Sequence, residues 1–206
     1  MGLFIVFEGV EGSGKSTQSH ELHRRLHQAD VDSILVREPG GTPTAEYVRD
    51  WLIGGHGISP LTELLLFSAA RASLIDSVIN PALAEGRPVV CDRYIYSTLA
   101  YQGYGRAMDM TSINNLNSIA TGGLVPDLVV LLDVPPETGF LRKQGGDPSD
   151  RFEREGAAFH QRVHKGYRAL AKNDPERWLV LDGSLNQREL SDAVWKRVSD
   201  IRKEED

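Results

Sequence analysis

A glycine-rich segment near the start of the chain has residue types and a spacing that suit phosphate binding. Residues 9–16 read Gly-Val-Glu-Gly-Ser-Gly-Lys-Ser, which satisfies the pattern Gly-x4-Gly-Lys-Ser. In such a loop the glycines let backbone N–H groups point inward, the lysine reaches the β- and γ-phosphates of a nucleoside triphosphate, and the serine hydroxyl ligates Mg²⁺. The residues predicted to bind the triphosphate are Gly9, Val10, Glu11, Gly12, Ser13, Gly14, Lys15, Ser16 and Thr17.

One residue of this loop, Glu11, carries a charge that is unfavourable beside a triphosphate. A side chain that faces solvent is one interpretation. The other is that the carboxylate points away from the triphosphate, toward the hydroxyl of a second substrate or toward the water shell of the metal.

The elements that would position this loop alternate between strand-like and helix-like patterns. Short β-branched or aromatic runs predict strands, and longer stretches with helical periodicity predict helices. Because the two kinds alternate, we expect an α/β fold, a five-stranded parallel sheet doubly wound by helices. The predicted strands are 3–7, 33–37, 88–91, 127–134 and 178–182, and the predicted helices are 15–29, 44–53, 62–79, 111–120, 153–171 and 187–201.

Two charged residues follow the third predicted strand, at the sheet edge where ligands of such folds bind. Asp92 can hold Mg²⁺ through water or brace a cation, and Arg93 offers a planar fork that grips a phosphate with two hydrogen bonds. We therefore predict a catalytic role for both and a metal site at Ser16 and Asp92. The alternative is a structural ion pair between Asp92 and Arg93.

Aromatic and polar side chains on two further segments are candidates for binding a nucleobase. Phe67 and Arg71 are four residues apart on a predicted helix and share a face, so a ring and a guanidinium could stack a base and bond its edge. Alternatively, Phe67 belongs to the core and Arg71 to the surface. Thr98, Tyr101 and Gln102 add a hydroxyl, a phenol and an amide that could line a pocket for sugar and base.

Length, net charge and cysteine content disfavour several classes of protein. The 206 residues predict a single domain, 1–206, and the net charge of −6 disfavours binding to nucleic acid or to an anionic membrane. The longest apolar runs fall far short of the ~20 residues that a membrane-spanning helix needs. One cysteine, Cys91, excludes an internal disulfide and a thiolate zinc site. We expect a soluble, cytoplasmic protein.

Histidines recur at helical spacing in two places. His20, His23 and His27 lie on one predicted helix, and His160 and His164 are four apart on another. Each set sits among charged residues and lacks the acidic partner of a zinc hydrolase, so we interpret both as solvated helix faces.

Five segments of the chain, in this order and at this spacing, resemble the thymidylate kinase family. The resemblance covers nearly the whole chain, and its most specific parts are the second and fourth segments. The five are residues 7–17 (Phe-Glu-Gly-Val-Glu-Gly-Ser-Gly-Lys-Ser-Thr), 37–42 (Arg-Glu-Pro-Gly-Gly-Thr), 67–71 (Phe-x3-Arg), 92–102 (Asp-Arg-Tyr-x2-Ser-x2-Ala-Tyr-Gln) and 150–153 (Asp-Arg-Phe-Glu).

The resemblance implies an activity, a fold and an assembly. The activity is transfer of the γ-phosphoryl group of ATP to dTMP, which gives dTDP and ADP, with Mg²⁺ as cofactor. The fold is that of P-loop NTPases, with a short mobile lid over about 142–152, and the assembly is a homodimer.

It also implies roles for individual residues. Around the base, Phe67 would stack on thymine, Arg71 would bond its O4, and Thr98 and Gln102 would address the remaining base edge. Around the rest of the nucleotide, Tyr101 would lie beneath the sugar, Arg93 would hold the phosphate, and Glu11 would address the 3′-hydroxyl or the metal region. Glu38 and Pro39 would border the sugar-phosphate, and Phe152 would close over the nucleotide.

The predicted lid is the segment that departs from the family pattern. Lid-type members present several arginines, whereas this chain has glycines in the middle and only Arg142, Lys143 and Arg151 as cations. We predict that Arg142 and Arg151 are catalytic and neutralise transition-state charge. Two other functions stay open: a kinase for another deoxynucleoside monophosphate or for a deoxynucleoside, and a P-loop switch that lacks catalysis. The guanine-reading element Asn-Lys-x-Asp is absent, which disfavours the commonest switch.

Overall fold

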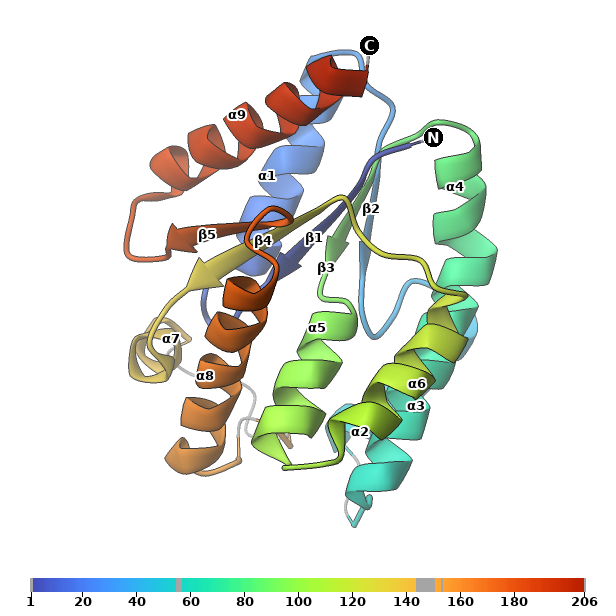
Figure 1. Cartoon of the computed structure of the whole chain (residues 1–206), viewed down its shortest axis with the longest axis vertical. Helices are drawn as coiled ribbons and strands as arrows, with labels where there is room; N and C mark the ends of the chain where they lie inside the picture. Colours follow the sequence, from blue (N-terminus) through green and yellow to red (C-terminus); the bar gives the residue numbers. More distant parts are fainter. Residues whose placement is uncertain (1, 55–56, 144–150, 153, 206) are drawn as a thin grey trace.

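The computed structural model describes residues 2–54, 57–143, 151–152 and 154–205 and contains a five-stranded parallel sheet between two layers of helices (Figure 1). The strand order is β2-β3-β1-β4-β5, so that β1 lies at the centre. The predicted fold class and all five predicted strands are confirmed. Their bounds are β1 Phe4–Glu8, β2 Ile34–Arg37, β3 Val89–Asp92, β4 Leu128–Asp133 and β5 Trp178–Asp182.

The register of the strands brings their carboxyl ends to one edge of the sheet. Phe7 of β1 is paired with Asp92 of β3 on one side and with Val130 of β4 on the other. Because parallel strands point the same way, the residues that follow β1, β2 and β3 meet at that edge. The predicted site residues that directly follow these three strands, Glu11, Glu38 and Arg93 among them, line one cavity there.

Alternate side chains of β1 support the two helix layers, which explains why the strand is apolar throughout. Ile5 and Phe7 pack toward Leu26 and Val194, whereas Phe4 and Val6 pack toward the opposite layer. The first layer consists of α1 (Lys15–Gln28) and α9 (Gln187–Glu205).

The second layer contains the helices that carry the predicted base-binding residues Phe67, Arg71, Thr98, Tyr101 and Gln102 (Figure 1). Its apolar side chains pack on the other face of the sheet, around Leu74 and Ile79 at one end and around Val163 and Tyr167 at the other. The remaining elements are α2 Pro43–Gly54, α3 Pro60–Leu74, η1 Ile75–Ile79, α4 Asn80–Ala84, α5 Ile95–Thr98, η2 Leu99–Gly105, α6 Met110–Thr121, α7 Pro136–Arg142 and α8 Ala157–Asn173.

The sequence prediction missed three helical segments: α4, α5 with η2, and the short α7. The segment η2 is a π-helix, in which the amide of Arg106 bonds the carbonyl of Tyr101 five residues back. This wider turn spoils the usual helical period, and Gly103 and Gly105 weaken the local helix signal further. The predicted helix over 153–171 begins at Ala157.

Two further features concern membrane-spanning helices and the predicted lid. Within the described ranges, no helix is long and apolar enough to cross a membrane. Most of the lid predicted over 142–152 lies outside the described residues, which resume at Arg151.

Candidate active site

A cavity of about 490 Å³ opens at the carboxyl edge of the sheet, between the glycine-rich loop and α3. Its described walls carry seven cationic side chains and three carboxylates, so the local charge is positive although the whole chain is acidic. Such a cavity favours polyanionic ligands. The charged residues are Lys15, Arg37, Arg49, Arg71, Arg93, Arg142 and Lys143, with Glu11, Glu38 and Asp92.

The loop between β1 and α1 has the backbone that the glycine pattern predicts. Gly9, Gly12 and Gly14 all have positive φ angles, of 145°, 70° and 97°. Gly12 also packs against α7, where an added Cβ would lie 2.0 Å from the carbonyl oxygen of Gly139. No larger residue fits at this position, so Gly12 lets the loop pack directly against α7.

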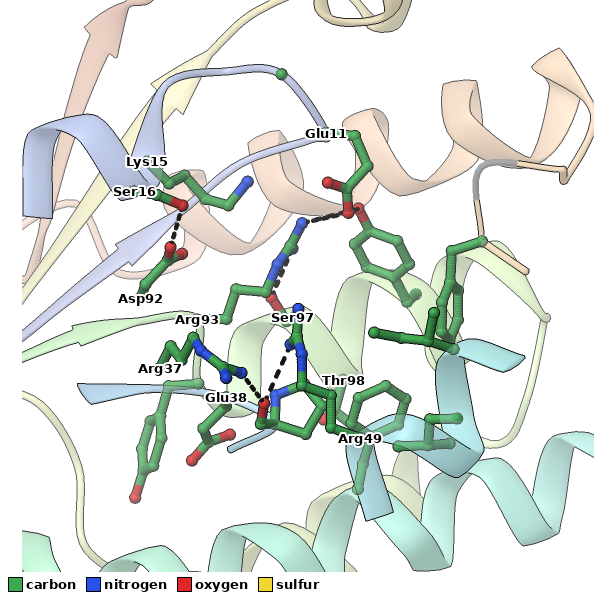
Figure 2. Close-up of a pocket in the computed structure, with 18 of the residues that line it drawn as sticks. Glu11, Lys15, Ser16, Arg37, Glu38, Arg49, Asp92, Arg93, Ser97 and Thr98 are labelled. Carbon is green, nitrogen blue, oxygen red and sulfur yellow. Dashed lines mark hydrogen bonds and ion pairs between the residues drawn. The ribbon is translucent and has the colours of Figure 1, made fainter. Parts of the chain in front are cut away.

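Lys15 extends from the first turn of α1 toward the centre of the cavity (Figure 2). Its Nζ donates to the carbonyl of Val10 at 2.9 Å, which holds the ammonium across the loop. Burial lowers the pKa of Lys15 to about 8, with Arg93 acting in the same direction. The lysine is therefore a desolvated cation, whose attraction for a phosphate is stronger than that of a surface lysine.

Ser16 and Asp92 form a paired oxygen site beside this lysine. The Ser16 hydroxyl donates to Oδ2 of Asp92 at 2.5 Å (Figure 2). The other carboxylate oxygen, Oδ1, is buried and has no hydrogen-bond partner among the described residues. An unpartnered buried oxygen next to a hydroxyl fits Mg²⁺, which prefers oxygen ligands and retains several waters.

Arg93 points from the end of β3 toward the glycine-rich loop. It has a left-handed backbone, with φ of 73°, and its Nη2 lies 2.5 Å from Oε1 of Glu11. Its Nη1 donates to Ser97 at 3.1 Å. In the described structure Arg93 thus pairs with Glu11 while Asp92 bonds Ser16, and the alternative of a structural Asp92–Arg93 ion pair is wrong.

Glu11 lines the cavity, and its side chain is only partly exposed. Burial raises its pKa, but Arg93, Lys15 and Lys143 outweigh that effect and lower the pKa to about 2. The carboxylate also accepts a hydrogen bond from the Tyr101 hydroxyl at 3.2 Å. Glu11 is thus an ionised group that orients two neighbouring side chains.

A fully buried carboxylate, which the sequence analysis did not single out, supports the turn that contains Arg93. Glu8, the last residue of β1, accepts hydrogen bonds from the amides of Tyr94 and Ser97 at 2.9 and 3.1 Å. It also accepts from the hydroxyls of Ser97 and Tyr167 at 2.6 and 3.0 Å. Burial raises the pKa of Glu8. Because these bonds fix the turn that contains Arg93, Glu8 helps to hold the strained backbone of that arginine.

Three aromatic side chains, Phe67, Tyr101 and Phe152, form an aromatic pocket at the other end of the cavity. The Phe152 ring centroid lies 5.9 Å from that of Phe67 and 5.9 Å from that of Tyr101. Phe67 lines the cavity and also packs against the core, as one of the two interpretations made from the sequence expects; base stacking stays a prediction. A flat ring is the ligand that such a wall accommodates.

Arg71 lines the same cavity as these three rings and is only 2% exposed. The alternative that Arg71 is a surface residue is therefore wrong. Its Nε donates to Glu38 and its Nη1 to Asn117, both at 2.8 Å. Its Nη2 donates to Thr98 at 2.9 Å and to a backbone carbonyl. Since a guanidinium has five N–H groups, one N–H of Nη1 has no partner among the described residues and is available to a ligand.

Glu38 and Pro39 form the wall that follows β2. Burial raises the pKa of Glu38 to about 7, against the opposing effect of Arg71. The carbonyl of Pro39 accepts from Arg37 at 2.8 Å and from Arg49 at 3.1 Å (Figure 2). Sequence reasoning missed Arg49, although its spacing to the other cavity residues of α2, Leu52 and Ile53, was a usable helical signal.

The lid-side cations lie in two different places. Arg142 lines the cavity while donating to the carbonyl of Gly183 at 2.8 Å, and Nζ of Lys143 lies 3.8 Å from Glu11. Arg151 instead pairs with buried Glu63 and is not among the described residues that line the cavity. The structure thus does not support the predicted catalytic role of Arg151. The lid-side cations that do line the cavity are Arg142 and Lys143.

The interpretation of His160 and His164 as a solvated face is wrong. His160 is buried between the rings of Phe140 and Phe159, and Nε2 of His164 lies 2.6 Å from Oδ1 of Asp133. No group of three or more His, Cys, Asp or Glu suited to a metal occurs within the described ranges. These histidines are packing residues.

A glycine-rich phosphate loop and an aromatic pocket that share one cationic cavity define a P-loop kinase, a phosphotransferase that acts on nucleoside monophosphates. The family model described as thymidylate kinase matches residues 7–194. The chain belongs to the thymidylate kinase family.

Individual relatives agree with this assignment over nearly their whole length. The chain is 48% identical to the thymidylate kinase of Thermomicrobium roseum, over 98% of this chain and 97% of that one. It is 50% identical to the thymidylate kinase of Dehalococcoides mccartyi, over 97% and 96% of the two chains. Among solved structures, thymidylate kinase from Ehrlichia chaffeensis matches with a TM-score of 0.78 and 36% identity, over 96% and 98% of the chains.

Proposed function

We propose that the protein transfers the γ-phosphoryl group of ATP to dTMP. An oxygen of the dTMP phosphate attacks the γ-phosphorus, the bond from that phosphorus to the β–γ bridging oxygen breaks, and ADP leaves as dTDP forms. The observation that carries this proposal is the position of Arg93, whose guanidinium lies between the glycine-rich loop and the aromatic pocket. A phosphate held there faces the end of a triphosphate on the loop.

The ATP side consists of residues 9–17, with Lys15 as the cation on the terminal phosphates. Ser16 and Asp92 would hold Mg²⁺, in keeping with the unpartnered Oδ1 of Asp92. When bound, Mg²⁺ neutralises charge on the phosphate oxygens. Lys15 stays close enough to share that task because the loop holds its ammonium in the cavity.

The base of dTMP is proposed to enter the aromatic pocket, where Phe67 stacks on thymine. The remaining N–H of Arg71 donates to O4, and Glu38 holds the rest of that guanidinium in place. Thr98 and Gln102 address the other polar atoms of the base edge. A site built from a donating guanidinium selects a base with a carbonyl group over one with an amino group.

The sugar and phosphate are proposed to lie between Phe152 and the loop. Tyr101 lies under the sugar, Glu11 addresses the 3′-hydroxyl, and Pro39 borders the sugar-phosphate. Arg93 grips the phosphate, and Arg142 with Lys143 supplies further positive charge near the transferred group. Catalysis then consists of alignment plus neutralisation of charge on the equatorial oxygens.

We also propose that the protein is a cytoplasmic homodimer of one domain each, with α2, α3 and α6 at the interface. These three helices are neighbours, and they leave large apolar side chains exposed. Large apolar side chains exposed on neighbouring helices favour association. The exposed residues are Tyr47, Trp51, Leu61, Leu65 and Ile119.

The proposal is tested by incubating the purified protein with Mg-ATP and each of dTMP, dUMP, dCMP, dAMP and dGMP while following ADP release. We expect dTMP to give the largest kcat/KM. A larger value for another monophosphate would replace the substrate. ATP binding without transfer to any acceptor would favour a non-catalytic switch.

A further inference from the structure

A buried acidic residue outside the proposed mechanism connects three segments around the aromatic pocket. Glu63, on the first turn of α3, has a fully buried side chain and accepts from Nε2 of Gln102 at 2.5 Å. It also accepts from Nε and Nη2 of Arg106 at 3.2 and 3.1 Å, and it pairs with Arg151. A carboxylate that accepts from this many donors, two of them guanidiniums, is held in one orientation.

The first consequence concerns the polarity of Gln102, which lines the cavity. A carboxylate can only accept hydrogen bonds, so the side-chain amide of Gln102 must point its nitrogen toward Glu63. The carbonyl oxygen, with the second N–H, is what Gln102 can then offer to the cavity. An acceptor at this place suits a base that carries a ring N–H, as thymine does, and disfavours cytosine, whose corresponding nitrogen is itself an acceptor.

The second consequence concerns Phe152, the part of the aromatic pocket that comes from a distant segment. The two arginines that pair with Glu63 both lie over the Phe152 ring, Arg151 at 4.9 Å and Arg106 at 5.9 Å from its centroid. Both contacts lie in the range of cation–π attraction. Holding these guanidiniums thus places the ring that faces Phe67.

We propose that Glu63 is a positioning residue for nucleobase selection, which fixes the amide polarity of Gln102 and the placement of Phe152. This inference rests on the proposed function, because it assigns a base to the aromatic pocket. Glu63 does not line the described cavity and acts through its neighbours.

The test is the isosteric variant Glu63→Gln, assayed with dTMP and with dCMP. In this variant the position of Oε2, which accepts from Nη2 of Arg106 and from Arg151, still requires an oxygen. The new NH₂ group therefore takes the position of Oε1, gives up the longer contact with Nε of Arg106, faces Gln102 and turns that amide over. We expect the ratio of kcat/KM for dTMP to that for dCMP to fall on the order of tenfold, about the effect of one reversed hydrogen bond. The KM for ATP should stay within about twofold, since the loop is untouched.

Two further variants separate positioning from a structural role. Glu155→Gln alters the outer partner of Arg106, which lies 2.5 Å from Glu155, and should leave the substrate ratio unchanged. Glu63→Gln combined with Gln102→Glu returns an acceptor to the cavity side and should recover much of the discrimination. It also serves as the test should the single variant fail to fold.

The outcomes are distinct. If Glu63→Gln lowers the kcat/KM values for dTMP and dCMP by the same factor, or leaves both unchanged, the inference is overturned. It is also overturned if the double variant folds and discriminates no better than the single one. If the unmodified protein does not prefer dTMP in the monophosphate panel, the proposed function fails first.

Discussion

The Nη2 atom of Arg93 lies 2.5 Å from Oε1 of Glu11, and this ion pair joins the glycine-rich loop to the turn after β3. Arg93 therefore spans from the end of β3 to the loop (Figure 2). The pair is mostly buried, so its attraction is stronger than that of a surface salt bridge. Its geometry keeps the arginine fork at the boundary between the two proposed substrate positions.

Replacing Arg93 with lysine tests that position while keeping the charge. We expect Arg93→Lys to lower kcat/KM for dTMP by on the order of 10², because a lysine cannot form two parallel hydrogen bonds to a phosphate. Steady-state kinetics measures the loss, and calorimetry should find ATP binding retained. Arg87→Lys, at a surface arginine paired with Asp32, is the control. Undiminished turnover would remove Arg93 from the mechanism.

Replacing the ring of Phe67 with an aliphatic side chain tests the aromatic pocket. We expect Phe67→Leu to raise the KM for dTMP about tenfold, which is within the range of stacking one base on an aromatic ring. Phe140→Leu changes a ring that contacts His160 and does not line the described cavity, so it should leave this KM unchanged. An unaltered KM in Phe67→Leu, with a lower unfolding temperature, would return Phe67 to a core role alone.

Removing the charge of Asp92 tests the metal site. We expect Asp92→Asn to raise the Mg²⁺ concentration for half-maximal activity by on the order of tenfold, because an amide oxygen is a weaker ligand than a carboxylate. Chelation with EDTA should abolish transfer by the unmodified protein. Asp192→Asn, at an exposed partner of Arg25, should titrate like the unmodified protein. Equal Mg²⁺ requirements for the two variants would contradict the assignment.

The buried lysine predicts a pH dependence of ATP binding. Burial lowers the pKa of Lys15 to about 8, so the ammonium is present below that pH and is lost as the pH rises through it. We expect the Kd for ATP to be constant below pH 8 and to rise above it, by at most about tenfold per pH unit. Calorimetry from pH 7 to about 10 measures the trend. In Lys15→Arg, whose guanidinium stays charged, the trend should disappear, and its persistence there would assign it to another group.

A charged residue on the exposed face of α2 tests the proposed dimer. Trp51 is 62% exposed, one helical turn from exposed Tyr47. We expect Trp51→Lys to raise the dimer dissociation constant by on the order of tenfold or more, because it places a charge in an apolar interface. Sedimentation velocity measures the change. Val180→Lys, at an exposed position on β5, should have no effect. A monomeric unmodified protein would overturn the proposal directly.

Local patterns in the sequence were sufficient for the sheet and for the glycine-rich loop. The loop is encoded by contiguous residues, because glycine adopts the positive φ angles of Gly9, Gly12 and Gly14 without steric cost. The strands are encoded by short apolar runs, since a strand buried on both faces has no polar side. The π-helix η2 escaped prediction because its wider turn matches neither regular period.

The partners of the buried charges were decided only by the tertiary structure. Glu63 meets Arg151 across 88 residues and Glu8 meets Tyr167 across 159, and no spacing rule connects such positions. A periodic pattern specifies which face of an element is apolar, but it does not specify which distant donor reaches a buried carboxylate. That choice depends on how the elements pack, because a buried charge is tolerated only where the fold brings enough hydrogen-bond donors around it.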